Sequence, residues 1–331
     1  MNIIIPEKLK KGDEIRVIAP ARSLSLISEE LKQEAISKLE EQGYIVTFSK
    51  NCLEKDMFMS SSIESRVADI HDAFRDENVK AILTVIGGFN SNQLLKYLDY
   101  DLIRNNPKII CGYSDITALN NAIFKKTGLV TYIGPRFSTW GMQKGFNYTL
   151  DYFNKCLTTK DSYKVQESLE WSDDKWYLDQ ENRNFIKNDG IIIINEGTAE
   201  GVAIGGNLCA FNLLQGTEFM PDINDSVLFI EDDDQAGDLF SVEFDRNLQS
   251  LIDQPNFNKV QGIIIGRFQK QTDINLGKLK YIIKTKKELN NIPIVANLDF
   301  GHTAPLLTLP IGGQIKLSAK NNKLNFEIVA H

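Results

Sequence analysis

The stretch Lys108–Thr117, KIICGYSDIT, places a serine where a buried strand gives way to a helix. The residues before Ser114 are apolar and predict a strand that ends near Gly112, whereas Ala118–Phe124 (ALNNAIF) predicts a helix. A hydroxyl on such a corner points away from the sheet with helix N–H groups behind it, which is how α/β enzymes expose a serine nucleophile. Serine and aspartate are also favoured helix caps, so a purely capping role for Ser114 is the alternative.

The segments on both sides of this corner alternate between strand and helix patterns. Apolar residues at helical spacing predict one helix from Ile27 to Leu39, which Gly43 ends, and a second from Ile63 to Phe74. Short apolar stretches predict strands at residues 15–20, 44–48, 79–86, 108–112 and 130–133. Such alternation predicts an α/β fold whose parallel sheet is covered on both faces.

The pattern changes between about residues 150 and 190, where the chain is polar, carries Trp171 and Trp176 and lacks a clean period. Beyond it, short strands are expected at residues 190–194, 201–204, 227–230, 262–266 and 294–296, and Asn207 is expected to cap a helix over 208–214. We therefore predict an N-terminal parallel-sheet α/β domain (1–155), a linker or active-site loop (156–189) and a β-rich C-terminal domain (190–331).

Composition excludes several classes of protein. The 331 residues are 42% apolar and 24% charged, with a net charge of −7, which argues against a nucleic-acid polymer or an anionic membrane surface as partner. No transmembrane segment or signal peptide is expected. Four widely spaced cysteines predict reduced, mostly buried thiols in a cytoplasmic protein, and no motif indicates a metal site or another cofactor.

A serine nucleophile needs a base, and the chain offers three histidines. His302 follows an apolar strand in a loop rich in glycine and proline, which suits an imidazole that projects into a cleft. His71 lies beside the apolar stripe of a helix, where a structural role is expected, and His331 is the last residue, where disorder is expected. Elimination favours His302, with a structural role for it as the alternative.

A carboxylate is needed to orient that imidazole, and Glu231 stands at the carboxyl end of the strand Val227–Ile230. The acidic run Glu231–Asp234 is alternatively a solvated loop or a loop for a magnesium or calcium ion, although it lacks the EF-hand pattern. The N–H donors of an oxyanion hole are predicted at Gly88, in the loop after the third strand, and at Asp115. A plain turn or a phosphate-binding loop is the alternative for the glycines.

Five ordered motifs together resemble the serine LD-carboxypeptidase family (peptidase family S66). They are GGFNSNQLL at 87–95, GYSDIT at 112–117, GGNL at 205–208, LFIED at 228–232 and DFGH at 299–302. The resemblance implies a serine peptidase with a Ser-Glu-His triad at Ser114, Glu231 and His302, and an oxyanion hole at Gly88 and Asp115. It further implies a cytoplasmic, metal-independent homodimer whose triad spans an α/β domain and a β-rich domain. Ile116 replaces the second glycine of GxSxG, which is normal in this family.

Two branches of the family differ in substrate. One removes the terminal D-alanine from murein tetrapeptides, and the other resembles the microcin C immunity carboxypeptidase, which cleaves an aspartyl group from a modified adenylate. Segments EWSDDKWY (170–177) and GNLCAFNLLQGTEFMP (206–221) resemble the immunity branch. Trp176 is expected to stack on a purine, with Trp171, Phe89 and Asn90 as further substrate-binding candidates. The alternative is that both tryptophans cover the core edge.

The preferred prediction is a hydrolase of an aminoacyl- or peptidyl-nucleotide amide, whose partners are a small-molecule or short-peptide substrate and a second copy of the chain. The alternatives are a murein tetrapeptide LD-carboxypeptidase, a non-catalytic α/β protein that binds a ligand at Gly87-Gly88, and a thiol enzyme that uses Cys111.

Overall fold

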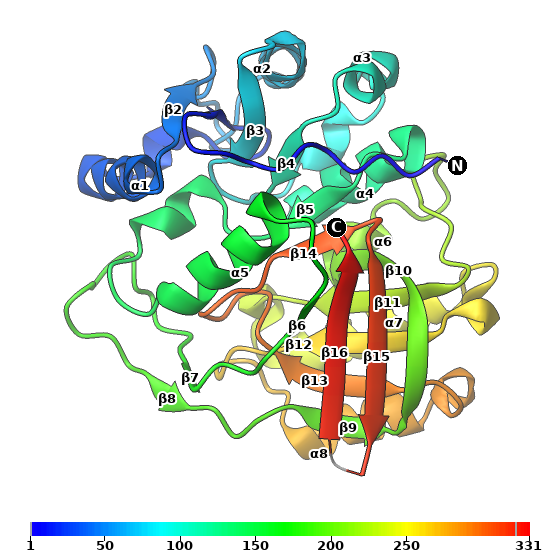
Figure 1. Cartoon of the computed structure of the whole chain (residues 1–331). Coiled ribbons are helices and arrows are strands. Elements are labelled where there is room, and N and C mark those ends of the chain that lie inside the picture. Colours follow the sequence, from blue (N-terminus) through cyan, green and yellow to red (C-terminus); the bar gives the residue numbers. More distant parts are fainter. Residues whose placement is uncertain (1, 322) are drawn as a thin grey trace.

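The computed structural model describes residues 2–321 and 323–331, which build two β-sheets joined through buried helices (Figure 1). The first sheet has the order β14-β5-β4-β3-β1-β2, and β1 to β5 run parallel. Its strands are β1 (Glu14–Ile18), β2 (Ile45–Phe48), β3 (Val79–Thr84), β4 (Ile109–Cys111), β5 (Thr131–Ile133) and β14 (Leu309–Ile311).

The helices of the N-terminal half follow from its apolar periodicity and its caps. They are α1 (Glu29–Glu41), α2 (Ile63–Arg75), α3 (Tyr100–Asn105), α4 (Ile116–Thr127) and α5 (Asn147–Thr158). The hydroxyls of Ser28 and Ser62 accept hydrogen bonds from the first turns of α1 and α2, and Gly43, with a φ of +93°, follows α1. The predicted helices and strands of this half are confirmed, with ends that differ by a few residues.

The second sheet has the order β6-β16-β15-β10-β11-β12-β13-β9. Its strands are β6 (Tyr163–Lys164), β9 (Ile192–Asn195), β10 (Gly197–Asn207), β11 (Ser226–Glu231), β12 (Gly262–Gly266), β13 (Ile294–Leu298), β15 (Gln314–Lys320) and β16 (Lys323–Ala330). The helices of this half are α6 (Leu208–Asn212), α7 (Phe240–Ile252) and α8 (Leu276–Lys284), and β7 (Glu170–Trp171) pairs with β8 (Ile186–Lys187). The expected fold class, α/β with a β-rich C-terminal sheet, is confirmed.

Helix α4 connects the two sheets and sets the position of the site. Ten of its twelve residues are buried, because it packs against the first sheet on one side and against β10 and α6 on the other. The Asn121 side chain exchanges two hydrogen bonds with the backbone of Gly205, and the Asn207 N–H donates to Thr117 Oγ1 at 3.0 Å. A side chain at Gly206 would collide with Thr117, so the glycine permits this close approach. The N-terminus of α4 therefore faces the C-terminal half.

Three features differ from the sequence-based expectations. Strands β10 to β13 are parallel and are accompanied by α7, whose residues Phe240, Phe244, Leu248 and Leu251 form a buried stripe at helical spacing that the sequence reading overlooked. Strand β14 leaves the C-terminal half and pairs with β5 of the first sheet. Helix α5 continues to Thr158, past the expected domain end at residue 155.

The expectation that His331 is disordered is wrong. This residue is 3% exposed, and its Nδ1 lies 2.8 Å from Lys8 Nζ and 2.6 Å from the Cys156 carbonyl oxygen. Packing of β16 beside β6 carries the chain end into the protein, which a local pattern does not reveal.

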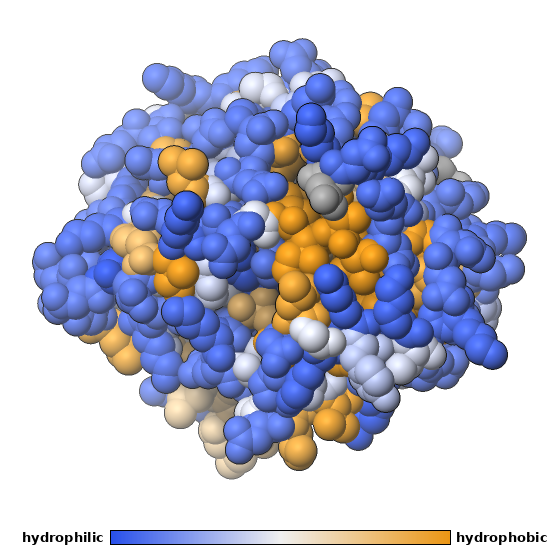
Figure 2. All heavy atoms as spheres, turned by 90° about the horizontal axis from the view of Figure 1, so that it is seen from below, coloured by the Kyte–Doolittle hydropathy of each residue, from blue (hydrophilic) through white to orange (hydrophobic). Residues whose placement is uncertain are grey.

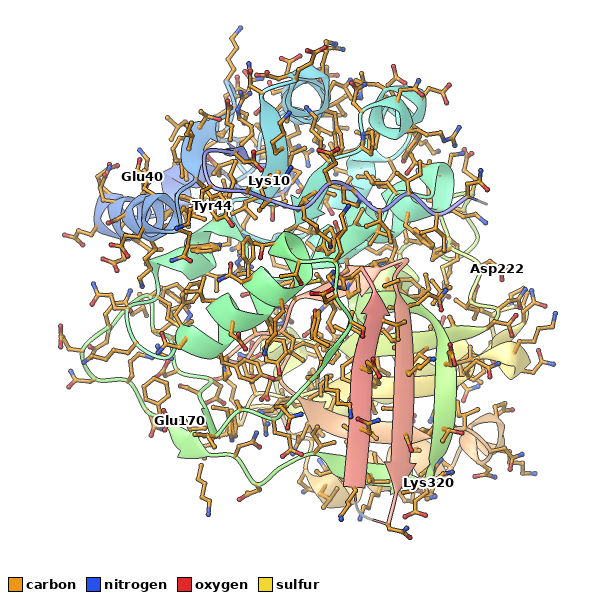
Figure 3. All side chains as sticks on the ribbon, in the orientation of Figure 1. Lys10, Glu40, Tyr44, Glu170, Asp222 and Lys320 are labelled. Carbon is orange, nitrogen blue, oxygen red and sulfur yellow. The ribbon has the colours of Figure 1, made fainter. Side chains whose placement is uncertain are left out.

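Charged side chains such as Glu40, Asp222 and Lys320 lie at the periphery, while the space between the elements is filled with apolar groups (Figure 3). Cys52, Cys111 and Cys156 are buried and Cys209 is exposed, and all four thiols are free, as expected. Among the described residues, no helix is both long and apolar enough to span a bilayer.

Candidate active site

Ser114 occupies a strained corner between β4 and α4. Its φ of +68° lies in the left-handed region that non-glycine residues rarely adopt, which is typical of a side chain forced into a functional position. The cap position of α4 is Asp115, which makes no side-chain cap hydrogen bond. The Ser114 hydroxyl instead lies 3.0 Å from His302 Nε2, so the alternative that Ser114 only caps the helix is wrong.

The structure brings Ser114, His302 and Glu231 together from three distant parts of the chain. His302 lies in the loop between β13 and β14, and its Nδ1 is 2.7 Å from Glu231 Oε2. With the proton on Nδ1, the ring donates to Glu231 and its Nε2 is free to accept from the Ser114 hydroxyl. The imidazole therefore bridges an alcohol and a carboxylate, an arrangement suited to general-base activation of the serine.

Glu231 is held at the end of β11 by close backbone contacts and is 2% exposed. A side chain at Gly301, which has a φ of +103°, would lie 2.6 Å from Glu231 Oε2, so glycine is needed for the His302 loop to pass the carboxylate. Burial lowers the pKa of His302, but the charge and hydrogen bond of Glu231 and the charge of Asp233 more than offset it, so the pKa of His302 is raised. The site thus favours the protonated, imidazolium form of His302.

A buried ion pair between Arg267 and Asp299 holds the segment that leads to His302. Asp299 Oδ1 lies 3.1 Å from Arg267 Nη2, and the Asp299 carboxylate also accepts from the N–H and the hydroxyl of Ser168. Trp171 lies over the Arg267 guanidinium, 5.0 Å from it. Trp171 lines neither of the two cavities beside Ser114 and His302, so the structure does not bring this predicted substrate-binding residue to the site.

The two residues predicted to form an oxyanion hole share a cavity with Ser114. Gly88 and Asp115 line the cavity beside Ser114, and within the described chain their N–H groups donate to no protein acceptor. The Asp115 carboxylate accepts from the N–H groups of Asn90 and Ser91 at 3.1 and 2.9 Å, which ties the glycine loop to the serine corner. Burial raises the pKa of this carboxyl group. Backbone N–H groups without an acceptor are the kind of donor that an oxyanion hole uses.

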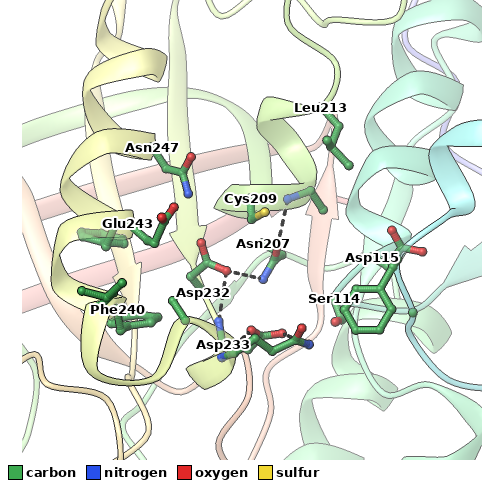
Figure 4. A pocket seen from close by; sticks show the side chains of 17 residues that line it. Ser114, Asp115, Asn207, Cys209, Leu213, Asp232, Asp233, Phe240, Glu243 and Asn247 are labelled. Atoms are coloured by element: carbon green, nitrogen blue, oxygen red, sulfur yellow. Dashed lines mark hydrogen bonds between the residues drawn. The ribbon is translucent and has the colours of Figure 1, made fainter.

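Ser114 lines one cavity and His302 lines another. The first cavity, about 520 Å³, is lined by Ser114, Gly88 and Asp115 together with Asp232, Asp233 and residues of α6 and α7 (Figure 4). The second cavity, about 340 Å³, is lined by His302, Tyr113, Arg136 and Trp176. Phe89 also lines the first cavity and is 64% exposed, whereas Asn90 lines a neighbouring groove with Arg22 and Arg66.

The sequence reading missed Arg136 and Asp233. Arg136 stands just beyond β5, where its guanidinium lies 4.4 Å from the centre of the Tyr113 ring. Asp233 Oδ2 lies 3.7 Å from His302 Nε2, the nitrogen that also faces Ser114. Both residues follow the carboxyl end of a strand, and that position is a signal by which they could have been found.

The alternatives based on a thiol or on a cation loop find little support in the geometry. Cys111 is fully buried, burial raises the pKa of its thiol well above the usual value, and its Sγ lies near the Pro135 carbonyl oxygen rather than a base. The acidic run does not converge, because Glu231 turns to His302 and Asp232 to Asn207. Among the described residues, no group of three or more His, Cys, Asp or Glu side chains is arranged to hold a metal ion.

Comparisons with known proteins cover nearly the whole chain. The LD-carboxypeptidase N-terminal domain of peptidase family S66 matches residues 15–134, and the LD-carboxypeptidase C-terminal domain matches residues 200–317. YocD of Bacillus subtilis is 56% identical over 312 residues, which are 94% of this chain and 95% of YocD. The microcin C7 self-immunity protein MccF of Escherichia coli is 30% identical over 332 residues, which are 97% of this chain and 95% of MccF.

Solved structures agree with this result. An MccF-like protein from Bacillus anthracis, 56% identical, superimposes with a TM-score of 0.98 over 99% of this chain and 100% of that chain. MccF in complex with aspartyl sulfamoyl adenosine, 30% identical, superimposes with a TM-score of 0.88 over 99% of each chain.

Proposed function

The chain belongs to the LD-carboxypeptidase family of serine peptidases, as its motifs predict, and we propose that it hydrolyses the amide between an aminoacyl or short peptidyl group and a modified nucleotide. The carrying observation is the His302 imidazole between Ser114 Oγ at 3.0 Å and Glu231 Oε2 at 2.7 Å. We assign these three residues as the catalytic triad.

In the proposed reaction, His302 Nε2 takes the hydroxyl proton as Ser114 Oγ attacks the carbonyl carbon. Glu231 holds the ring and stabilises the imidazolium, and the N–H groups of Gly88 and Asp115 bind the oxyanion. The tetrahedral intermediate collapses when His302 gives its proton to the leaving nitrogen, which breaks the C–N bond. Water, activated by the same imidazole, then releases the acyl group from Ser114.

The second cavity is the proposed site of the nucleotide, because His302, which protonates the leaving group, lines it. Trp176 offers an aromatic face for a purine in this cavity, and Arg136 offers a cation for a phosphate-like group. MccF, which is similar over nearly the whole chain, has been captured with an aspartyl sulfamoyl adenosine. These features support a nucleotide as leaving group.

A murein tetrapeptide LD-carboxypeptidase activity is the second candidate. The observation that favours it is again Arg136, because a guanidinium beside the leaving-group position also suits the terminal carboxylate of a departing D-alanine. The two candidates share the triad and differ only in what occupies the second cavity.

The test measures kcat/KM of the purified protein and of Ser114→Ala on an aminoacyl sulfamoyl adenosine and on a murein tetrapeptide. We expect turnover of the first substrate by the unaltered protein, and a loss of at least about 10⁴-fold in Ser114→Ala. Labelling by a fluorophosphonate should require Ser114. Unchanged hydrolysis by Ser114→Ala would overturn the triad, and turnover of the tetrapeptide alone would favour the second candidate.

We also propose a cytoplasmic homodimer, following the family resemblance and the four free thiols. The separate matches at residues 15–134 and 200–317 support two domains, with residues 156–189 as the segment between them. Sedimentation of the purified protein tests the dimer, and cell fractionation tests the location.

A further inference from the structure

The two cavities beside Ser114 receive different parts of the substrate. The leaving group must lie next to His302 Nε2, which protonates it, and the acyl carbonyl must point its oxygen at the Gly88 and Asp115 N–H groups. Gly88 and Asp115 line the first cavity, whereas His302 lines only the second. The first cavity is therefore the acyl side.

The charges that line this acyl-side cavity are of one sign. Asp115, Asp232, Asp233 and Glu243 line it, and in Figure 4 the last three follow one another from the Ser114 side toward α7 in the order Asp233, Asp232, Glu243. Among the described residues that line it, there is no lysine, arginine or histidine. Glu243, at the far end, is paired with the exposed Arg246 at 2.5 Å, and the Asp115 carboxylate accepts from the N–H groups of Asn90 and Ser91. Asp233 accepts from Gln235 and lies 3.7 Å from His302 Nε2, so Asp232 carries the least compensated charge in this cavity.

Asp232 is buried in the wall of the cavity, and only one of its two carboxylate oxygens accepts hydrogen bonds from the described chain. The residue is 9% exposed, and its Oδ1 accepts from Asn207 Nδ2 at 3.0 Å and from the Asp233 N–H at 3.1 Å. Within the described chain, its Oδ2 has no hydrogen-bond partner. Burial, together with the charges of Glu231 and Asp233, raises the pKa of Asp232 to about 7. A carboxylate in this setting is stabilised by a cationic ligand and repels an anionic one.

Part of the remaining wall of the cavity is apolar. Leu213, Leu239, Phe240 and Phe244 line it, so an aliphatic chain can be buried there while its polar end meets the carboxylates.

We infer that the acyl-side cavity binds a primary ammonium group on the acyl part of the substrate, held by Asp232 and Asp233. This inference rests on the proposed function, because the acyl side is assigned from the roles of His302 and the N–H donors. The ammonium belongs either to the α-amine of an aminoacyl group or to a lysine-like side chain. Repulsion by the same carboxylates disfavours an acidic acyl group, in contrast to the aspartyl ligand captured in MccF.

The test measures how well small acyl-group mimics protect Ser114 from fluorophosphonate labelling, a readout that does not depend on the leaving group. Nα-acetyl-lysinamide carries only the side-chain ammonium, norleucinamide carries only the α-ammonium, Nα-acetyl-norleucinamide carries neither, and Nα-acetyl-glutamic acid α-amide carries only a carboxylate. We expect at least one cationic mimic to protect at a concentration at least tenfold lower than the neutral one. The anionic mimic should be the weakest. Equal protection by the neutral mimic, or better protection by the anionic mimic, would overturn the inference.

Variants then assign the effect to the cavity. Asp232→Asn should reduce the preference for the cationic mimic to less than threefold, whereas Asp238→Asn, the same charge change at an exposed position outside the cavity lining, should preserve it. Unprotected labelling at the normal rate shows that a variant is folded. If Asp232→Asn does not fold, Asp233→Asn replaces it with the same expectation, and thermal unfolding then reports on folding, because this change also lowers the pKa of His302 and with it alters the labelling rate.

Failure of the proposed function gives a different result from failure of this inference. A protein whose Ser114 is not labelled at all would contradict the serine mechanism. The same four mimics would then be titrated by calorimetry, and their ranking would decide whether the cavity prefers an ammonium group.

Discussion

The two halves of the molecule contribute to the site in different ways. The N-terminal half places backbone beside the cavity: Ser114, at a φ of +68°, and Asp115 follow β4, and Gly88 follows β3. The C-terminal half supplies titratable side chains, Glu231, Asp233 and His302, at strand ends and on the loop after β13. We therefore expect substitutions in the N-terminal half to displace Ser114 and the backbone around it. Substitutions in the C-terminal half should instead change the protonation of His302.

The greatest loss of activity should follow from removing a charge next to His302 in the C-terminal half. Glu231→Gln removes the charge that stabilises the His302 imidazolium and weakens the selection of its tautomer, so kcat should fall by about 10⁴-fold. The measurement is steady-state kinetics on the preferred substrate, with thermal unfolding as the control for folding. A loss below tenfold in a folded variant would contradict the assigned role of Glu231.

A substitution in the N-terminal half that displaces Ser114 without changing a charge should lower the activity less. A Cβ at Gly87 would lie 2.9 Å from both Ser114 Cβ and Ser114 Oγ, so Gly87→Ala should displace the nucleophile and lower kcat/KM by about 10²-fold. The pH profile should keep its shape, because no charge near His302 changes. Gly277→Ala in α8 is the matched control and should retain full activity. A shifted pH profile in Gly87→Ala would contradict the expectation that a substitution in the N-terminal half leaves the protonation of His302 unchanged.

The proposed role of Trp176 in binding a purine can be tested with two substrates. If it stacks on a purine, Trp176→Ala should lower kcat/KM for the nucleotide substrate by about tenfold and leave a murein tetrapeptide much less affected. Parallel kinetics on both substrates measure this. Trp171→Ala is the comparison variant, because Trp171 covers Arg267 away from both cavities and should not discriminate between the substrates. Equal losses for Trp176→Ala on both substrates would remove the stacking argument.

The smallest effect concerns pH alone. His302 must be neutral to act as a base, so kcat/KM should rise as pH increases through the raised pKa of this group. Asp233 raises that pKa from 3.7 Å away, so Asp233→Asn should lower the pKa of His302 and move the acidic limb of the profile to lower pH. The check is kcat/KM between about pH 5 and 9. A limb that moves to higher pH would contradict the electrostatic role of Asp233.

The helices, the strands and the chemistry of single loops could be predicted from short stretches of sequence. Apolar spacing located α2 and β3, and the KIICGYSDIT stretch placed Ser114 at a strand-to-helix corner, because these signals arise from neighbours within a few residues. A shortage of histidines and the position of Glu231 after an apolar strand selected the other two candidate residues.

Contacts between distant segments could not be predicted in this way and became known only from the folded chain. The fold sets the distances of 2.7 and 3.0 Å from His302 to Glu231 and Ser114, and it pairs β14 with the first sheet. It also buries His331, and it places Trp176 in a cavity but Trp171 against Arg267. It also places Asp232 and Asp233 in the wall of one cavity beside Ser114. The physical reason is that periodicity records which face of an element is apolar, whereas the partner of that face is chosen by packing across the whole chain.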